Sequence, residues 1–144
     1  MKKIFMHSLI ALLTLGWISA NTSLAAEGNK VLYHVNLGNE QATDALRNIN
    51  NHLAVDPSAK IVVVTHSKGV DFLLEGAEDE NKNPYSGTVA KLASKGVEFR
   101  VCQITLERRK IDPKKLLPEA KLVPSGVAEV TKLQAKEGYA YLKP

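Results

Sequence analysis

Cys102 is the only cysteine in this 144-residue chain, and its position favours thiol chemistry. It ends an apolar segment, residues 97–102, and a stretch with helical spacing begins near Thr105. The N–H groups at the start of a helix stabilise a thiolate and lower its pKa, and Arg108 and Arg109 add positive charge nearby. Cysteine is also among the most buried residue types, so inert packing is the alternative interpretation. Accessibility of the thiol distinguishes the two, because a carrier thiol must be reached.

Polar residues follow the apolar segments that precede Cys102 in the chain. Residues 31–36, 60–65 and 97–102 all have the composition of strands. The carboxyl ends of parallel strands lie at one edge of a sheet, where open α/β proteins place their sites. The sequence therefore predicts a pocket around Cys102 at this edge. Its expected lining residues are Asn36, His66, Ser67, Gln103 and Arg108.

The two histidines near this edge allow several interpretations. His66 directly follows a strand and is interpreted as a ligand, a base or a capped loop residue, whereas His34 lies mid-strand, as a satisfied core histidine does. Residues 66–69 favour a small anion nest but lack the glycine-rich spacing of a P-loop. A metal site from His34, His66 and Cys102 is disfavoured because no two of these ligands are closely spaced. A hydrolase centred on Ser67 is disfavoured because no nucleophile elbow is present. We expect no metal and no cofactor.

The first 25 residues have the pattern of a secretory signal peptide. Lys2 and Lys3 precede an apolar run, residues 4–18, and Ser23-Leu24-Ala25 places small residues before a cleavage point at Ala26. An uncleaved anchor is the alternative, but the run is shorter than the about 20 residues that span a bilayer. We expect a signal at 1–25, a single mature domain at 26–144, a periplasmic location and no membrane contact after cleavage.

The charge pattern argues against nucleic-acid binding. The chain has a net charge of +4, and loss of Lys2 and Lys3 with the signal leaves +2 on the mature part. Basic side chains are dispersed among acidic ones, as in Lys91, Lys95, Glu98 and Arg100, and no basic stripe with interleaved aromatic residues is present.

Strand and helix patterns alternate along the mature chain. Residues 60–65 form a nearly continuous β-branched run, which is typical of a strand covered on both faces of a parallel sheet. Ser86 and Ser125 are expected to cap helices. Strands are expected at residues 31–36, 60–65, 97–102, 121–123 and 139–142, with helical segments at residues 42–53, 70–77, 86–96, 105–110 and 125–138. Five strands joined by helices predict a doubly wound α/β sheet that is mainly parallel.

Several segments together resemble the DsrE/DsrF-like family, of the intracellular sulfur-oxidation type. Residues 96–106, GVEFRVCQITL, resemble the cysteine segment of that family, and residues 63–70 resemble the loop after its second strand. Further similarity lies at residues 83–85, 123–129 and 133–141. The resemblance implies a flavodoxin-like three-layer sandwich, assembly into homotrimers or hexamers, and a persulfide on the cysteine that matches Cys102.

Two functions are expected from these observations. In the first, Cys102 carries sulfur as a persulfide between a donor and an acceptor protein, with Arg108 stabilising the thiolate and His66 assisting proton transfer. This would be a sulfur carrier or sulfurtransferase rather than a classical enzyme. In the alternative, the chain is a non-catalytic protein that binds a small ligand or builds an assembly. A late edge strand with Tyr139 and Tyr141 favours coverage by another subunit.

Overall fold

The computed structural model describes residues 28–144, so the predicted signal at 1–25 and the start of the mature domain lie outside the described residues. The strands are β1 (Lys30–Val35), β2 (Lys60–Thr65), β3 (Glu98–Cys102), β4 (Ala120–Val123) and β5 (Ala140–Leu142). The helices are α1 (Asn39–Val55), α2 (Tyr85–Ser94), α3 (Gln103–Arg109) and α4 (Gly126–Glu137), with 3-10 turns η1 (Ser67–Leu73) and η2 (Pro113–Lys115).

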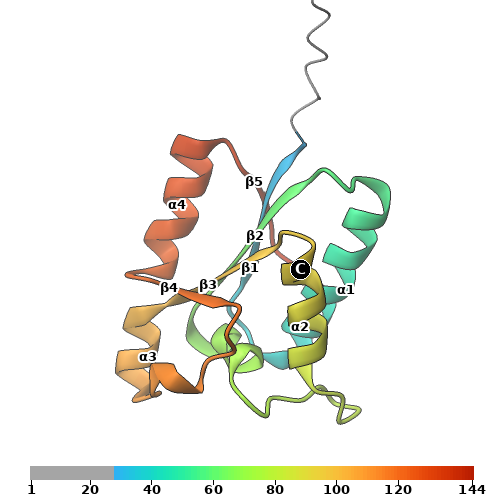
Figure 1. Cartoon of the computed structure of the whole chain (residues 1–144). Coiled ribbons are helices and arrows are strands. Elements are labelled where there is room, and N and C mark those ends of the chain that lie inside the picture. The colour runs from blue at the N-terminus through green and yellow to red at the C-terminus, as the bar shows by residue number, and fades with distance from the viewer. Residues whose placement is uncertain (1–27) are drawn as a thin grey trace, which may run out of the picture.

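The five strands form one sheet in the order β4-β3-β2-β1-β5, and every pairing is parallel. Helices cover both faces, with α1 and α2 on one side and α4 on the other (Figure 1). The three-layer α/β fold is therefore confirmed, and the sheet is wholly parallel rather than mainly so. Strand β2 lies at the centre with five of its six residues buried, as its β-branched run predicts.

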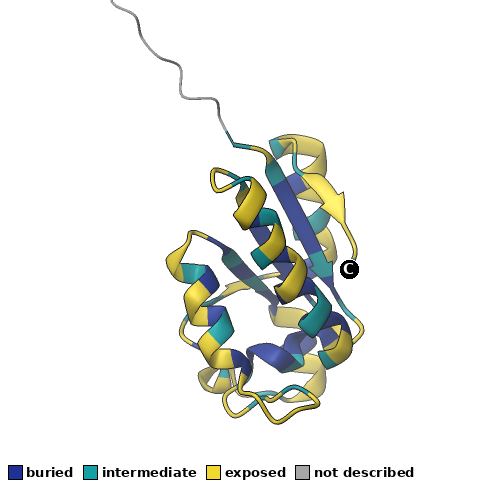
Figure 2. Ribbon diagram, turned by 90° about the vertical axis from the view of Figure 1, so that its right-hand side faces the viewer, coloured by how far each residue is buried: buried dark blue, intermediate teal, exposed yellow. Residues whose placement is uncertain are grey.

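The two faces of the sheet bury cores of different size. The larger core lies under α1 and α2 and includes Phe72 and Phe99, both completely buried. The smaller core lies under α4 and comprises Leu32, Val62, Val64 and Leu133. Strand β5 is exposed along its whole length at the sheet edge (Figure 2). Among the described residues, no helix combines the length and apolar character that crossing a membrane requires.

The helix starts differ from the sequence predictions in two places. Helix α2 begins at Tyr85 and is preceded by Pro84, so the predicted cap at Ser86 is wrong. The buried Tyr85 fixes the start, because its backbone N–H donates to the Ala77 carbonyl and its hydroxyl to the Asn39 carbonyl. Helix α3 begins at Gln103 rather than near residue 105. Cys102 is consequently both the last residue of β3 and the residue preceding a helix.

Helix α4 begins and ends as the sequence predicts. The Ser125 hydroxyl accepts a hydrogen bond from the Ala128 N–H, and Gly138 ends the helix with a φ of 74°. Arg100 on β3 pairs with Glu129 on α4 across the sheet face. These contacts fix the first turn of α4 directly above the carboxyl end of β3.

Candidate functional site

The sheet register brings Cys102 beside His66 at the carboxyl edge. Thr65 of β2 pairs with Val101 of β3, so the residues that follow them, His66 just after β2 and Cys102 at the end of β3, extend over the same face. The first residue of α4, Gly126, lies against both. A Cβ atom at Gly126 would lie 3.1 Å from the His66 Cβ and 3.2 Å from the Cys102 Cβ, closer than nine in ten real Cβ contacts. Glycine therefore allows the α4 backbone to approach the thiol.

Hydrogen-bond donors from two helix starts act on the Cys102 thiol. Burial raises the pKa of the thiol, but hydrogen bonds from the Thr105 hydroxyl and from the N–H groups of Gly126, Thr105 and Ile104 outweigh it, so the pKa lies below its usual value. Donors that point at a sulfur favour its charged form. Because these N–H groups come from the first turns of both α3 and α4, two helices contribute to one thiolate site.

The thiol is buried but opens into a pocket. Cys102 is 5% exposed, and it lines a pocket of about 230 Å³ at the carboxyl edge of the sheet. Ile104 and Val127 stand at the rim with exposures of 41% and 60%. The pocket residues are His66, Ser67, Cys102, Ile104, Thr105, Arg108, Ser125 and Val127. A small reagent therefore has a route to the sulfur, whereas a bulky one would meet the apolar rim.

The structure gathers three of the five predicted pocket residues around Cys102, namely His66, Ser67 and Arg108. The other two do not line this pocket. The Gln103 side chain donates to the Glu107 carboxylate at 2.8 Å. The backbone N–H of Asn36 donates to the Gln41 amide oxygen at 2.8 Å, beyond the end of β1.

Arg109 has a structural role in the loop after β2. Its guanidinium pairs with Asp71 at 2.6 Å and donates to the Ser67 carbonyl at 2.9 Å. The Ser67 N–H donates to the Thr105 hydroxyl oxygen at 3.0 Å. These bonds stabilise the left-handed conformation of Ser67, whose φ is 54°. Thr105 thus accepts from the loop with its oxygen and donates to the Cys102 sulfur with its hydrogen.

His34 belongs to the site, although its mid-strand position suggested only a satisfied core histidine. It is half-buried, and its Nε2 lies 2.7 Å from the Nε2 of His66. Its Nδ1 lies 2.7 Å from the Tyr141 hydroxyl. The Nδ1 of His66 lies 2.9 Å from the Ser67 hydroxyl. Parallel register explains the contact: His34 pairs with Val64, and His66, two residues beyond Val64 and just after the end of β2, continues over the same face.

Both histidines favour the neutral form. Burial is the main cause that lowers the pKa of His34, to about 4, and the positive charges of His66 and Lys143 lower it further. Burial and then Lys143 also lower the pKa of His66. At neutral pH, each ring therefore carries one N–H and offers one acceptor nitrogen.

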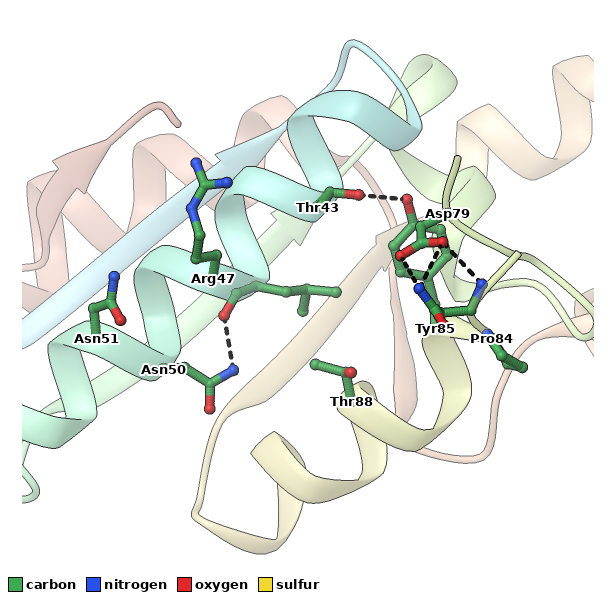
Figure 3. Close-up of a pocket in the computed structure, with 10 residues that line it drawn as sticks. Thr43, Arg47, Asn50, Asn51, Asp79, Pro84, Tyr85 and Thr88 are labelled. Atoms are coloured by element: carbon green, nitrogen blue, oxygen red, sulfur yellow. Dashed lines mark hydrogen bonds between the residues drawn. The ribbon is translucent and has the colours of Figure 1, made fainter. Parts of the chain in front are cut away.

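A second pocket, of about 330 Å³, lies on the opposite face of the sheet between α1 and α2 (Figure 3). Thr43 and Tyr85 meet across it through a 2.7 Å bond between their hydroxyls. Arg47, Asn50 and Asn51 project from α1 along its wall. None of its lining residues is shared with the Cys102 pocket.

The described residues contain no group of three or more histidine, cysteine or acidic side chains that could hold a metal ion. His34, His66 and the thiol therefore do not form such a group. The site therefore combines a stabilised thiolate at Cys102 with the hydrogen-bonded imidazole rings of His34 and His66.

Comparison with known proteins defines the family. The model of the DsrE/DsrF-like family matches residues 29–144, so the chain belongs to that family. MTH1491, a protein of unknown function from Methanobacterium thermoautotrophicum, is 32% identical with a TM-score of 0.70, over 81% of this chain and 99% of that one. The ychN protein from E. coli shares the fold at 14% identity with a TM-score of 0.68, over the same shares of the two chains. No curated protein matches this chain.

Proposed function

We propose that this protein is a sulfur carrier that holds a persulfide on Cys102. The observation that carries the proposal is a thiol that opens into a pocket beside the first residue of α4, with hydrogen bonds from Thr105, Ile104 and Gly126 that lower its pKa. Membership of the DsrE/DsrF-like family suggests a role related to sulfur relay and supports the proposal. An inert packing cysteine would need neither the donors nor the opening.

The proposed cycle has two balanced steps. In loading, the Cys102 thiolate attacks the outer sulfur of a donor persulfide; the donor S–S bond breaks, its electron pair stays on the inner sulfur, and that thiolate takes up one proton. In unloading, an acceptor thiol gives up one proton, and its thiolate attacks the outer sulfur on Cys102. Cys102 is released as a thiolate, and no external oxidant or reductant is needed.

Intact mass spectrometry tests the loading step. After incubation with glutathione persulfide, we expect a gain of about 32 Da per sulfur atom, which cyanide should remove. Cys102→Ser should stay at its starting mass while keeping its fold, because the two side chains are close in size. If the wild-type protein gains no sulfur and reacts with iodoacetamide only after unfolding, Cys102 is a packing residue and the proposal fails.

The second candidate function is non-catalytic binding of a small ligand, and the pocket between α1 and α2 favours it. This pocket is the larger of the two and combines an arginine with amide and hydroxyl groups. A thermal-shift screen of small polar metabolites, with Arg47→Ala as the control, would test it. Binding that Arg47→Ala abolishes and Cys102→Ser leaves unchanged would support this candidate over the carrier.

We further propose export to the periplasm and assembly into a trimer or hexamer. The sequence pattern at residues 1–25 supports export, and the exposed edge strand β5 supports assembly. Sequencing of the exported protein should begin at Ala26 or Glu27. An exported chain that retains Met1 would contradict the cleavage.

A further inference from the structure

We propose that Tyr141, His34, His66 and Ser67 form a two-way proton relay between the surface at β5 and the Cys102 pocket. The relay deepens the proposed function, because it handles the proton that each half of the carrier cycle must move. Its parts come from three places in the chain: the carboxyl half of β1, the loop after β2, and β5.

The contacts form an unbroken line. The Tyr141 hydroxyl lies 2.7 Å from His34 Nδ1, the two Nε2 atoms lie 2.7 Å apart, and His66 Nδ1 lies 2.9 Å from the Ser67 hydroxyl. All three separations are hydrogen-bond distances. At one end Tyr141 is 39% exposed, and at the other end Ser67 lines the pocket with Cys102. The line therefore runs from an exposed hydroxyl on β5 to the pocket that holds Cys102.

Two neutral histidines can stand this close only if one proton lies between them, since two lone pairs or two N–H groups would repel each other. That requirement gives the line a direction. When His34 donates to His66 through Nε2, His66 must donate to Ser67 and His34 must accept from Tyr141. When His66 donates to His34, all three bonds reverse. The relay thus has two states that differ by the tautomer of both rings.

Each half of the carrier cycle converts one state into the other. In loading, Ser67 gives its hydroxyl proton to the departing alkyl thiolate, and His66 Nδ1 donates a proton to Ser67 in its place. His34 then passes its Nε2 proton to His66. Tyr141 passes its hydroxyl proton to His34 Nδ1. Tyr141 regains its proton from solvent. In unloading, the proton of the acceptor thiol travels the same line outward. Loading and unloading therefore reset each other, and neither ring keeps an extra proton.

The low proton affinity of both rings suits this role. The positive charge of Lys143 acts on His34 and His66 and opposes an imidazolium on either. A proton that arrives is passed on rather than stored. At the pocket end, Ser67 lines the same pocket as Cys102, so its hydroxyl can serve as a positioned proton donor to the departing alkyl thiolate.

Two small thiol reagents test the relay separately from sulfur carriage. Methyl methanethiosulfonate releases a sulfinate that needs no proton, whereas 2-hydroxyethyl disulfide releases an alkyl thiolate that does. Both modify Cys102 by attack of the same thiolate. A change in the reactivity of the thiolate affects both modification rates. The ratio of the 2-hydroxyethyl disulfide rate to the methyl methanethiosulfonate rate therefore reports proton delivery to the leaving group.

In His34→Gln and in Tyr141→Phe, we expect the rate with 2-hydroxyethyl disulfide to fall by about tenfold or more, which is part of the roughly 100- to 10,000-fold that proton transfer by a positioned group contributes. The rate with methyl methanethiosulfonate should stay within about twofold. Glutamine keeps a hydrogen-bonding group near the position of Nε2 but cannot pass a proton. His52→Gln, the same change in α1 on the opposite face, is the matched control and should alter neither rate.

An unchanged ratio of rates in either relay variant would overturn the proposal, whether both rates fall together or neither falls. A changed ratio with no sulfur uptake from glutathione persulfide by the wild-type protein would support the relay and refute the carrier. Sulfur uptake with an unchanged ratio would support the carrier and refute the relay. The two failures are therefore distinguishable.

Discussion

At Cys102, burial and hydrogen bonding act on the thiol in opposite directions. Burial alone would raise its pKa and leave a packing cysteine, but the donors of Thr105, Ile104 and Gly126 favour the thiolate more strongly. A hydrogen bond to a charged group contributes about 1.5–3 kcal/mol, so the loss of one donor is measurable. The balance between burial and hydrogen bonding at Cys102 decides whether this buried thiol is reactive or inert.

Thr105→Val should raise the pKa of Cys102, because it removes the hydroxyl that donates to the sulfur and keeps the shape of the side chain. We expect alkylation by iodoacetamide near neutral pH to slow roughly tenfold. A hydrogen bond to a charged group contributes about 1.5 kcal/mol or more, and its loss lowers the thiolate fraction by about that factor. The pH dependence of the alkylation rate measures the pKa directly. Thr88→Val, in the pocket between α1 and α2, is the control. An unshifted profile in Thr105→Val would show that the hydroxyl does not stabilise the thiolate.

The His34 ring should make the stability of the protein depend on pH. Its pKa is about 4 in the folded chain and 6.5 in the unfolded one, so between these values the unfolded chain binds more protons. The free energy of unfolding should therefore fall as pH falls through this window. Urea titrations at pH 7 and pH 5 should show a smaller loss for His34→Gln than for the wild-type protein. Equal losses would contradict the lowered pKa.

At the scale of the elements, α4 completes the site by contributing the Gly126 N–H to a thiol on another element. Ser125 caps this helix and Arg100 pairs with Glu129 to hold it over β3. The absence of a side chain at Gly126 lets the helix start against the strand ends. The Cys102 thiolate therefore depends on the position of α4 as well as on the residues next to Cys102 in the sequence.

Gly126→Ala should disturb the site while the fold persists. The added Cβ would lie 3.1–3.2 Å from His66, Cys102 and the Thr65 carbonyl, so α4 or the strand ends must shift. We expect slower alkylation of Cys102 and a loss of about 1–3 kcal/mol of stability, as for overpacked sites. Gly87→Ala, in open space on α2, is the matched control and should be neutral or stabilising. A wild-type alkylation rate in Gly126→Ala would show that the close approach is unnecessary.

Sequence patterns predicted the elements better than the contacts between them. The β-branched run of β2 and the spacing of apolar residues on α1 follow from local rules and are confirmed. Cys102 and His66 were placed at one edge because strand ends can be located from sequence. The contact between His34 and His66 depends on strand order and register, which no local pattern contains. Asn36 and Gln103 also lie at strand ends, but their side chains lie outside the pocket that contains Cys102.

At the scale of the whole molecule, the sheet is covered unevenly. The face under α1 and α2 buries most of the core, whereas the face under α4 buries four core residues. The edge strand β5 exposes Tyr141 and Leu142 at 39% and 42%. Exposed edges of this kind are commonly protected by pairing or by a neighbouring subunit. Because Tyr141 and Leu142 are successive residues of β5 and point to opposite faces of the sheet, a subunit that covers Leu142 agrees with the proposed oligomer and leaves the Tyr141 hydroxyl open to solvent.

A charge at the β5 edge should weaken this assembly. Light scattering should give a trimer or hexamer for the mature wild-type protein and smaller species for Leu142→Lys, because a buried lysine without a partner opposes association. Val55→Lys, at the exposed end of α1, introduces the same charge elsewhere and should leave the mass unchanged. A wild-type protein that is monomeric at micromolar concentration would contradict the assembly.

A single complete turnover of sulfur shows whether Cys102 both accepts and releases it. The protein is loaded with glutathione persulfide, freed of excess donor, and mixed with 2-mercaptoethanol while its intact mass is followed. We predict a gain of about 32 Da on one site per chain, followed by a return to the starting mass as one sulfur per chain appears on the acceptor thiol. An adduct that also forms in Cys102→Ser, or one that no acceptor thiol removes, would contradict the account of Cys102 as a sulfur carrier.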